Sequence, residues 1–192
     1  MNKKILIKRV DDVLRPIGFH RKGVSWNRRS DAFVEVVELT VGKFGTDYTF
    51  SLGVWIDGPG TRIWGDKFSD FVPEPACPVR CRIGQFLDPP RDAWWKFADD
   101  ESVDQFEELV LRRGVPFLVS MRSKLAVEGW LSDRKVTKKY YPPPIITLAL
   151  LKIDRGDVRE GRRILRGLAA SVEGDWKQLV DDLVDELCGS SA

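Results

Sequence analysis

After its first 17 residues the hydrophobic periodicity of this chain changes once, from that of strands to that of helices, and this change limits the possible folds more than any single motif. From Tyr48 to Ile56 every second residue is a large hydrophobic one, the pattern of a β-strand. After Pro89 and Pro90 the hydrophobic residues recur with the period of an α-helix, and they do so to the end of the chain. Strands followed by helices, rather than alternating with them, predict an α+β fold.

Local signals predict the order of the elements. Residues 3–17 carry the hydrophobic stripe of an amphipathic helix, and Gly18 ends it. Four β-rich runs follow, at residues 24–28, 33–41, 48–56 and 79–87, with a hairpin turn around Gly45. Residues 57–60 favour a turn, and a loop rich in proline, glycine and aromatic residues is expected after them. We therefore expect an N-terminal helix and an antiparallel sheet of about four strands in a meander, followed by helices packed on one face and a C-terminal helical annex.

The second half of the chain predicts helices and one internal boundary. Ser102 and Gln105 fit a capping box, and a basic connector at residues 132–141 ends in three prolines. Three helices are predicted after it, the last with one hydrophobic face formed by Trp176, Leu179, Val180, Leu183, Val184 and Leu187. This divides the chain into an α+β domain, residues 1–131, and a helical annex, residues 142–188, packed on it.

Composition excludes several classes of protein. The chain has 192 residues, 43% of them hydrophobic and 31% charged, which is typical of a folded globular protein. Its longest strongly hydrophobic run, residues 145–151, is too short to cross a membrane, and the N-terminus resembles no signal peptide. Three cysteines suggest reduced thiols rather than a disulfide framework, so we expect a cytoplasmic protein.

Four segments occur in a fixed order along the first two thirds of the chain. They are the opening Val13-Leu14-Arg15-Pro16-Ile17-Gly18-Phe19-His20-Arg21-Lys22-Gly23 with Trp26 after it, the strand Tyr48 to Val54, the segment Cys77-Pro78-Val79-Arg80-Cys81-Arg82-Ile83-Gly84, and Gly114-Val115-Pro116-Phe117-Leu118. Together they resemble a bacterial family, the domain-of-unknown-function family 4304, over most of residues 5–120. The resemblance implies an α+β fold with an antiparallel sheet and implies no activity. Pro78 replaces a histidine that is usual in the family, and a glutamine that often ends its second strand is replaced near Leu39 and Thr40.

Residues typical of catalysis and metal binding are scarce. The single histidine, His20, lies beside Arg21 and Lys22, where it lacks an orienting carboxylate and is a poor general base. Cys77 and Cys81 are not accompanied by the second pair of ligands that a zinc site requires. We predict no catalytic residue, no metal and no cofactor.

Arg80 and Arg82 are the first candidates for a binding site. On a strand both point to the face opposite Val79, Cys81 and Ile83, where two guanidinium groups can grip a carboxylate or a phosphate. The alternative interpretation is that they form salt bridges with acidic residues such as those of residues 99–101.

Tryptophans and basic segments supply the other candidates. Trp55, Trp64, Trp94 and Trp95 are expected around the edge of the sheet, its loop and the junction with the helices, and aromatic residues are frequent at interaction hot spots. The alternative interpretation is that they fill the core between sheet and helices. The first thirty residues carry nine lysines and arginines, Arg21 and Lys22 among them, against two aspartates. Lys135, Lys138 and Lys139 beside Tyr140 and Tyr141 resemble a nucleic-acid contact, although the whole chain has a net charge of only +2.

These observations favour a non-enzymatic cytoplasmic protein that binds another macromolecule, with a protein as the expected partner and an immunity-like role compatible with it. Its candidate binding residues are Arg80, Arg82, Trp55, Trp64, Arg21 and Lys22. The alternative is an anion- or nucleotide-binding protein, or an enzyme, centred on Arg80 and Arg82 with Glu35 or Asp57 nearby. A deep cleft at the arginines would favour the alternative, whereas a flat aromatic patch would favour the binding protein.

Overall fold

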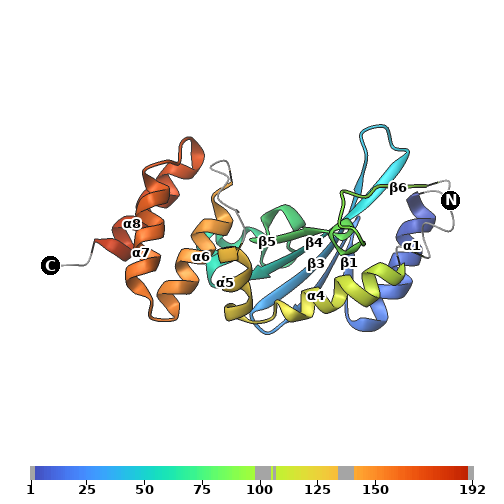
Figure 1. Cartoon of the computed structure of the whole chain (residues 1–192), viewed down its shortest axis with the longest axis horizontal. Helices are drawn as coiled ribbons and strands as arrows, with labels where there is room; N and C mark the ends of the chain where they lie inside the picture. The colour runs from blue at the N-terminus through green and yellow to red at the C-terminus, as the bar shows by residue number, and fades with distance from the viewer. Residues whose placement is uncertain (1–2, 98–104, 106, 134–140, 190–192) are drawn as a thin grey trace. The chain divides into compact units, whose positions relative to one another are not determined.

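The computed structural model describes residues 3–97, 105, 107–133 and 141–189 (Figure 1). The predicted capping residue Ser102 and the basic residues Lys135, Lys138 and Lys139 lie outside the described residues. The chain forms two compact units. The first, here called the sheet unit, comprises Met1–Ile56 and Phe68–Arg122, and the second, the helical unit, comprises Asp57–Lys67 and Ser123–Ala192.

The sheet unit is built on an antiparallel sheet that has six strands within the described residues. Five follow one another in a meander, and the sixth pairs with β4 beyond the end of β5. Their bounds are β1 (His20–Lys22), β2 (Ser25–Ser30), β3 (Phe33–Val41), β4 (Asp47–Ile56), β5 (Val79–Arg82) and β6 (Trp95–Lys96). The predicted α+β class and antiparallel meander are confirmed, with more strands than the four expected.

Helices cover one face of this sheet, and the hydrophobic core lies between them. The helices are α1 (Lys3–Leu14) with η1 (Arg15–Ile17), and the π-helical segment η5 (Val110–Gly114) that leads into α4 (Val115–Ser120). Leu6 and Leu14 of α1 are fully buried, as are Phe50 and Leu52 of the sheet. A Cβ on Gly114 would lie 3.2 Å from Leu52, so glycine allows η5 to pack directly on β4.

A buried ion cluster lies on the same covered face. Glu35 on β3 is fully buried and accepts hydrogen bonds from Arg28 on β2 and from Arg122, which follows α4. The Arg122 Nε atom lies 2.8 Å from Glu35 Oε1, and its Nη2 lies 3.0 Å from Glu35 Oε2. The hydrogen bond that Arg122 donates to Glu35 raises the pKa of Arg122 above its ordinary value. The cluster therefore joins two strands to the chain that covers them.

The helical unit consists of five helices within the described residues, packed around a core of their own. Their bounds are α2 (Pro59–Trp64), α5 (Lys124–Asp133), α6 (Pro143–Asp154), α7 (Val158–Ala169) and α8 (Asp175–Cys188). The core joins α2, α6, α7 and α8 through Ile63, Ile146, Leu150, Leu168, Val172, Val180 and Leu183. The predicted C-terminal helices are thus present. None of the described helices has the length and hydrophobicity needed to cross a bilayer.

Three local features differ from the predicted elements. The segment expected as a loop after Ile56 contains α2, which belongs to the helical unit. The strand expected over residues 79–87 ends at Arg82, because residues 83–86 form the 3-10 helix η4 (Ile83–Phe86). The part after Pro90, predicted to be wholly helical, begins with β6.

Candidate functional site

The face of the sheet opposite the covering helices is lined with polar side chains, because polar residues occupy the alternate positions of several strands. The strand register places one polar or charged residue from each of β1 to β5 in a row across this face: Lys22, Ser25, Glu38, Ser51 and Arg82. Thr40 and Thr49 face each other in the neighbouring row. Alternation along a strand therefore separates this polar face from the hydrophobic core behind it.

Part of the polar face is covered by the chain between Val72 and Cys77. The backbone N–H of Val72 donates to Asn27 Oδ1 at 2.7 Å, and that of Glu74 donates to Glu38 at 3.2 Å. Gly53 of β4 makes the close approach possible, since a Cβ there would lie 2.7 Å from Cys77 Sγ. This segment, including η3 (Glu74–Ala76), forms one wall of a hollow in the polar face.

The hollow has a volume of about 470 Å³ and is open to solvent. It is lined by acids, arginines and hydroxyl groups from β3, β4, β5 and η3, namely Glu38, Thr40, Ser51, Glu74, Pro75, Arg80, Cys81 and Arg82. Small-molecule sites are usually enclosed and mostly apolar. An open hollow with mixed charges can instead receive a side chain or a loop of a larger partner.

Arg80 and Arg82 lie side by side on the polar face as predicted, but their surroundings differ. Arg80 donates from Nε and Nη2 to the two carboxylate oxygens of Glu74, each at 2.9 Å. Glu74 is 5% exposed, so its charge depends on Arg80 for compensation. The structure thus gives Arg80 a nearby ion partner, while the acidic residues 99–101 lie outside the described residues.

Arg82 is more accessible to a binding partner than Arg80. Its Nη1 donates to Asp92 Oδ1 at 2.7 Å, and both side chains of this ion pair are well exposed. Its guanidinium lies over the Trp94 ring at 5.1 Å, and Trp94 Nε1 donates to the other oxygen of Asp92 at 3.3 Å. Arginine and tryptophan are the residue types most enriched at interaction hot spots.

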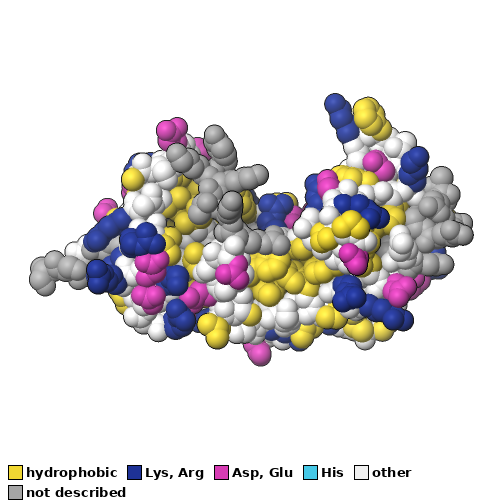
Figure 2. Space-filling view, in the orientation of Figure 1, with side chains coloured by type: hydrophobic (Ala, Val, Ile, Leu, Met, Phe, Trp, Pro, Cys, Tyr) yellow, Lys and Arg dark blue, Asp and Glu magenta, His cyan; other side chains and the backbone are white. Residues whose placement is uncertain are grey.

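The β3–β4 hairpin projects beyond the rest of the sheet (Figure 1), and its turn carries an aromatic side chain. Phe44 is 84% exposed there, with Lys43 Nζ 6.0 Å from its ring centre. The segment with Trp94 runs beside the β4 arm of the hairpin, because Trp95 pairs with Tyr48 and the Phe97 N–H donates to Thr46. Hydrophobic and cationic side chains stand out together at this tip in Figure 2.

The other predicted binding residues make different contacts from those of Phe44, Arg82 and Trp94. Trp55 is on the same face of β4 but is 3% exposed and packs edge-on against Phe68. Trp64 belongs to the helical unit, where its ring packs edge-on against Trp176 at 5.2 Å. Both tryptophans therefore serve packing. Trp94 and Trp95 divide in the same way, with Trp94 exposed and Trp95 buried.

Arg21 and Lys22 are exposed on the edge strand β1, next to the exposed His20. Arg21 donates to the carbonyl of Gly23 and lies 3.6 Å from Asp11, and Lys22 lies over the ring of Phe71 at 5.7 Å. Charged residues on an edge strand discourage pairing with other chains. These contacts account for both residues without a ligand.

Glu35 cannot supply the acid of a site at the two arginines in the way expected. Glu35 pairs with Val54, so it points to the covered face, whereas Arg80 pairs with Gly53 and points to the opposite one. Asp57 belongs to the helical unit. Within the described residues no cluster of three or more histidine, cysteine, aspartate or glutamate side chains is placed to hold a metal ion.

Both cysteines of the Cys77–Cys81 segment are buried. Burial raises the pKa of the Cys77 thiol well above its ordinary value, and the nearby Glu74 carboxylate raises it further. Because the thiolate is the reactive form, Cys77 should be inert in the native protein.

We therefore expect native Cys77 to resist iodoacetamide at pH 8 and to be alkylated fully after unfolding, as measured by peptide mass spectrometry. The unfolded chain loses the thiol proton at lower pH than the native one does, so Cys77 should reduce stability as the pH rises above about 8.5. Comparison with Cys77→Ala isolates this contribution. Rapid native alkylation would contradict the burial of the thiol.

Three residues described above, Phe44, Glu74 and Asp92, were not predicted from the sequence as parts of a site. Phe44 follows Lys43 in a turn, and an exposed aromatic residue in a hairpin turn is a signal that could have identified it. Glu74 and Asp92 lie in irregular segments, and their pairing with Arg80 and Arg82 depends on chain reversals that periodicity does not describe.

Comparison with protein families matches residues 10–117 to the family described as Domain of unknown function (DUF4304). The chain belongs to this family. The matched residues include every strand of the DUF4304 sheet together with Arg80, Arg82 and Trp94. Comparisons with curated proteins and with solved structures found no match.

Proposed function

We propose that this DUF4304 protein is a non-enzymatic, cytoplasmic binding protein that recognises a partner protein through the surface formed by Phe44, Arg82 and Trp94. The observation that carries the proposal is the arrangement of Arg82, which lies over an exposed tryptophan at the rim of an open hollow. An immunity-like role, in which the protein covers a toxin, is one form that this recognition could take.

The physical argument rests on how much each group can contribute when a partner covers it. Phe44 and Trp94 would lose exposed apolar area, which is worth about 25 cal/mol per Å². Arg82 is held by Trp94 and by an exposed aspartate, so a partner carboxylate can take the place of Asp92 at little cost. Arg80 contributes charge balance to Glu74 and shapes the hollow.

Affinity capture from native lysate, with substitutions at this surface, tests the proposal. We expect the wild type to enrich a specific protein, and Phe44→Ser and Trp94→Ala each to reduce its recovery at least tenfold. Arg82→Lys should also weaken recovery, because lysine retains the charge but not the planar fork of arginine. Melting temperatures should stay within about 2 °C of the wild type, since all three side chains are exposed.

Leu125→Ser is the matched control, because Leu125 is an exposed hydrophobic residue of the helical unit. It should leave recovery unchanged. If no partner is recovered under any growth condition, or if all variants recover it equally, this surface is not a protein-binding site.

An anion- or nucleotide-binding function is a second candidate, because hydroxyl groups line the hollow together with Arg82. Ser51 lies opposite Arg82 on the neighbouring strand, and Thr40 lines the same hollow. Phosphate, sulfate and ATP distinguish the two candidates. A rise in melting temperature that disappears in Arg82→Ala would favour anion binding over protein recognition.

A further inference from the structure

Glu38 is the carboxylate of the hollow that the described residues leave without a counter-charge. It lies on β3, is half-buried and lines the hollow. Its one hydrogen bond within the described residues comes from the backbone N–H of Glu74, at 3.2 Å, and no cation among those residues forms an ion pair with it. A carboxylate has about four acceptor positions, so most of those of Glu38 are unused.

Comparison with the other carboxylates of the described chain shows what Glu38 lacks. Those that are buried each form an ion pair with an arginine or a lysine, and they are Asp11, Glu35, Glu74 and Glu128. Glu107 is half-buried like Glu38, but it pairs with Arg9 at 2.8 Å. A partly desolvated charge costs free energy unless other groups compensate it. A cation from another molecule would offset this cost at Glu38.

The two arginines of the hollow already have carboxylate partners. Arg80 donates to both oxygens of Glu74, and Arg82 donates to Asp92. Charges of opposite sign are therefore matched in these two pairs, whereas the charge of Glu38 is not. The net charge of the hollow favours a cation over an anion.

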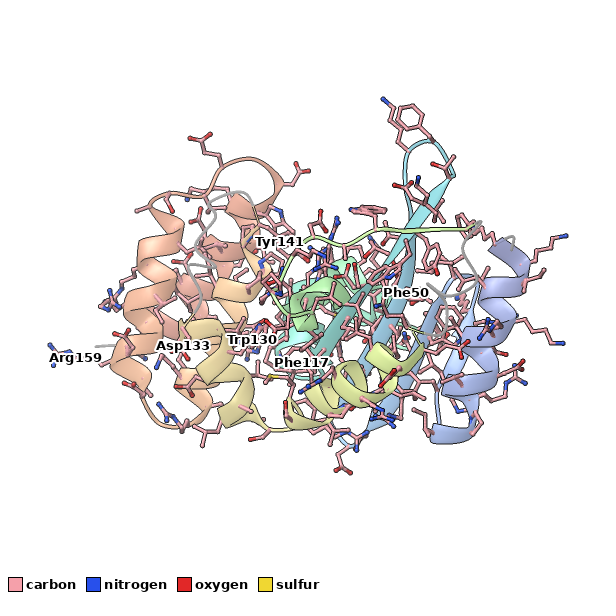
Figure 3. All side chains as sticks on the ribbon, turned by 45° about the vertical axis from the view of Figure 1, so that its right-hand side comes forward. Phe50, Phe117, Trp130, Asp133, Tyr141 and Arg159 are labelled. Atoms are coloured by element: carbon pink, nitrogen blue, oxygen red, sulfur yellow. The ribbon has the colours of Figure 1, made fainter. Side chains whose placement is uncertain are left out.

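Two hydroxyl groups lie beside Glu38 on the same face of the sheet. Ser51 of β4 is directly opposite Glu38, and Thr40 is two residues further along β3. Both line the hollow. Phe50, the neighbour of Ser51 in the chain, points the other way and is fully buried among the side chains of the sheet unit (Figure 3). Alternation thus brings three acceptor groups together at the hollow.

We propose that a lysine side chain of the partner protein enters the hollow and that its ammonium group binds Glu38, Ser51 and Thr40. The inference rests on the proposed function, because it names a group by which that partner is recognised. An ammonium group has three donors and no acceptor, which matches one carboxylate and two hydroxyl groups. The aliphatic stem of the lysine can lie against Pro75, which lines the same hollow.

Glu38→Gln distinguishes this role from a structural one. Removing the uncompensated charge should raise the melting temperature of the isolated protein by about 2 °C, and it should reduce recovery of the partner at least tenfold. Glu107→Gln is the matched control, because it removes a half-buried glutamate that has a cation. That variant should melt at a lower temperature and recover the partner as the wild type does. A lower melting temperature for Glu38→Gln would show that this chain itself supplies the counter-charge, and would overturn the proposal.

Cross-linking of the captured complex with a carbodiimide tests the contact directly, because this reagent condenses a carboxylate with an adjacent amine. Peptide mass spectrometry should find Glu38 joined to a lysine of the partner. If Phe44→Ser abolishes recovery while Glu38→Gln does not, and no such cross-link forms, the proposed function stands and this inference fails.

A small probe tests the hollow when no partner is captured, the result that would refute the proposed function. NMR titration of the full chain with N-acetyl-lysine amide should shift the backbone amide signals of Thr40 and Ser51 in the wild type but not in Glu38→Gln. N-acetyl-glutamate amide should leave them in place. Absence of shifts with the lysine probe would overturn the proposal, and so would shifts with the glutamate probe alone, since they would assign the hollow to anions.

Discussion

Replacing Glu35 by alanine is expected to lower the free energy of unfolding by about 3–5 kcal/mol. Glu35 is fully buried, and the side chain of its partner Arg28 is 14% exposed. Arg28 has a buried Nη2 that finds no hydrogen-bond partner within the described part of the chain even when Glu35 is present. Removing the carboxylate would leave this guanidinium without its counter-charge.

Urea denaturation monitored by tryptophan fluorescence provides the measurement. Glu35→Gln should also destabilise the protein, because it keeps the size of the side chain but removes its charge. Glu108→Ala is the control, since Glu108 forms an exposed ion pair with Arg112 at 3.3 Å and should contribute no more than about 0.5 kcal/mol. A loss below about 1 kcal/mol for Glu35→Ala would show that the cluster is solvated rather than buried.

Truncation after Ser171 is expected to unfold the helical unit and cause aggregation. Helix α8 contributes Val180 and Leu183 to its core and places Trp176 against Trp64. Without them, Ile146, Leu150 and Leu168 would expose an apolar face of the kind that drives association. Size-exclusion chromatography and thermal unfolding measure the result.

The full-length variant Val180→Asp tests the same core without deleting chain. Val180 is fully buried, and an aspartate there would be an unpaired buried charge, which should cost about 4 kcal/mol or more. Leu125→Asp is the control, because Leu125 is 64% exposed. A truncated protein that stays monomeric with an unchanged melting temperature would contradict the shared core.

Much of the secondary structure follows from the sequence alone, because periodicity is a local property. The strand predicted at residues 33–41 is observed as Phe33–Val41, and the next one differs by a single residue at its start. The face assigned to Arg80 and Arg82 is likewise confirmed, since alternation along a strand leaves no other choice once Val79 and Cys81 are buried. The family resemblance over residues 5–120 agrees with the match at residues 10–117.

Helix α2 could not be predicted from local sequence signals. Residues 57–67 contain glycine, proline and aromatic residues, which indicated a loop. In the structure, Ile63 of α2 packs against Ile146 and Leu150 of α6, far along the chain. A six-residue helix gains little from its own hydrogen bonds, so contacts with α6 and α8 determine its formation.

The difference between the two arginines of the candidate site was decided by tertiary structure. Alternation in the sequence placed Arg80 and Arg82 on one face and did not distinguish between them as binding residues. The chain reversal at η3 brings buried Glu74 against Arg80, and the segment before β6 brings Asp92 and Trp94 against Arg82. The strength of an ion pair depends on the distance between the two charges and on their burial. Both are set by which distant segments pack against β5. The alternation of residues along a single strand carries no information about them.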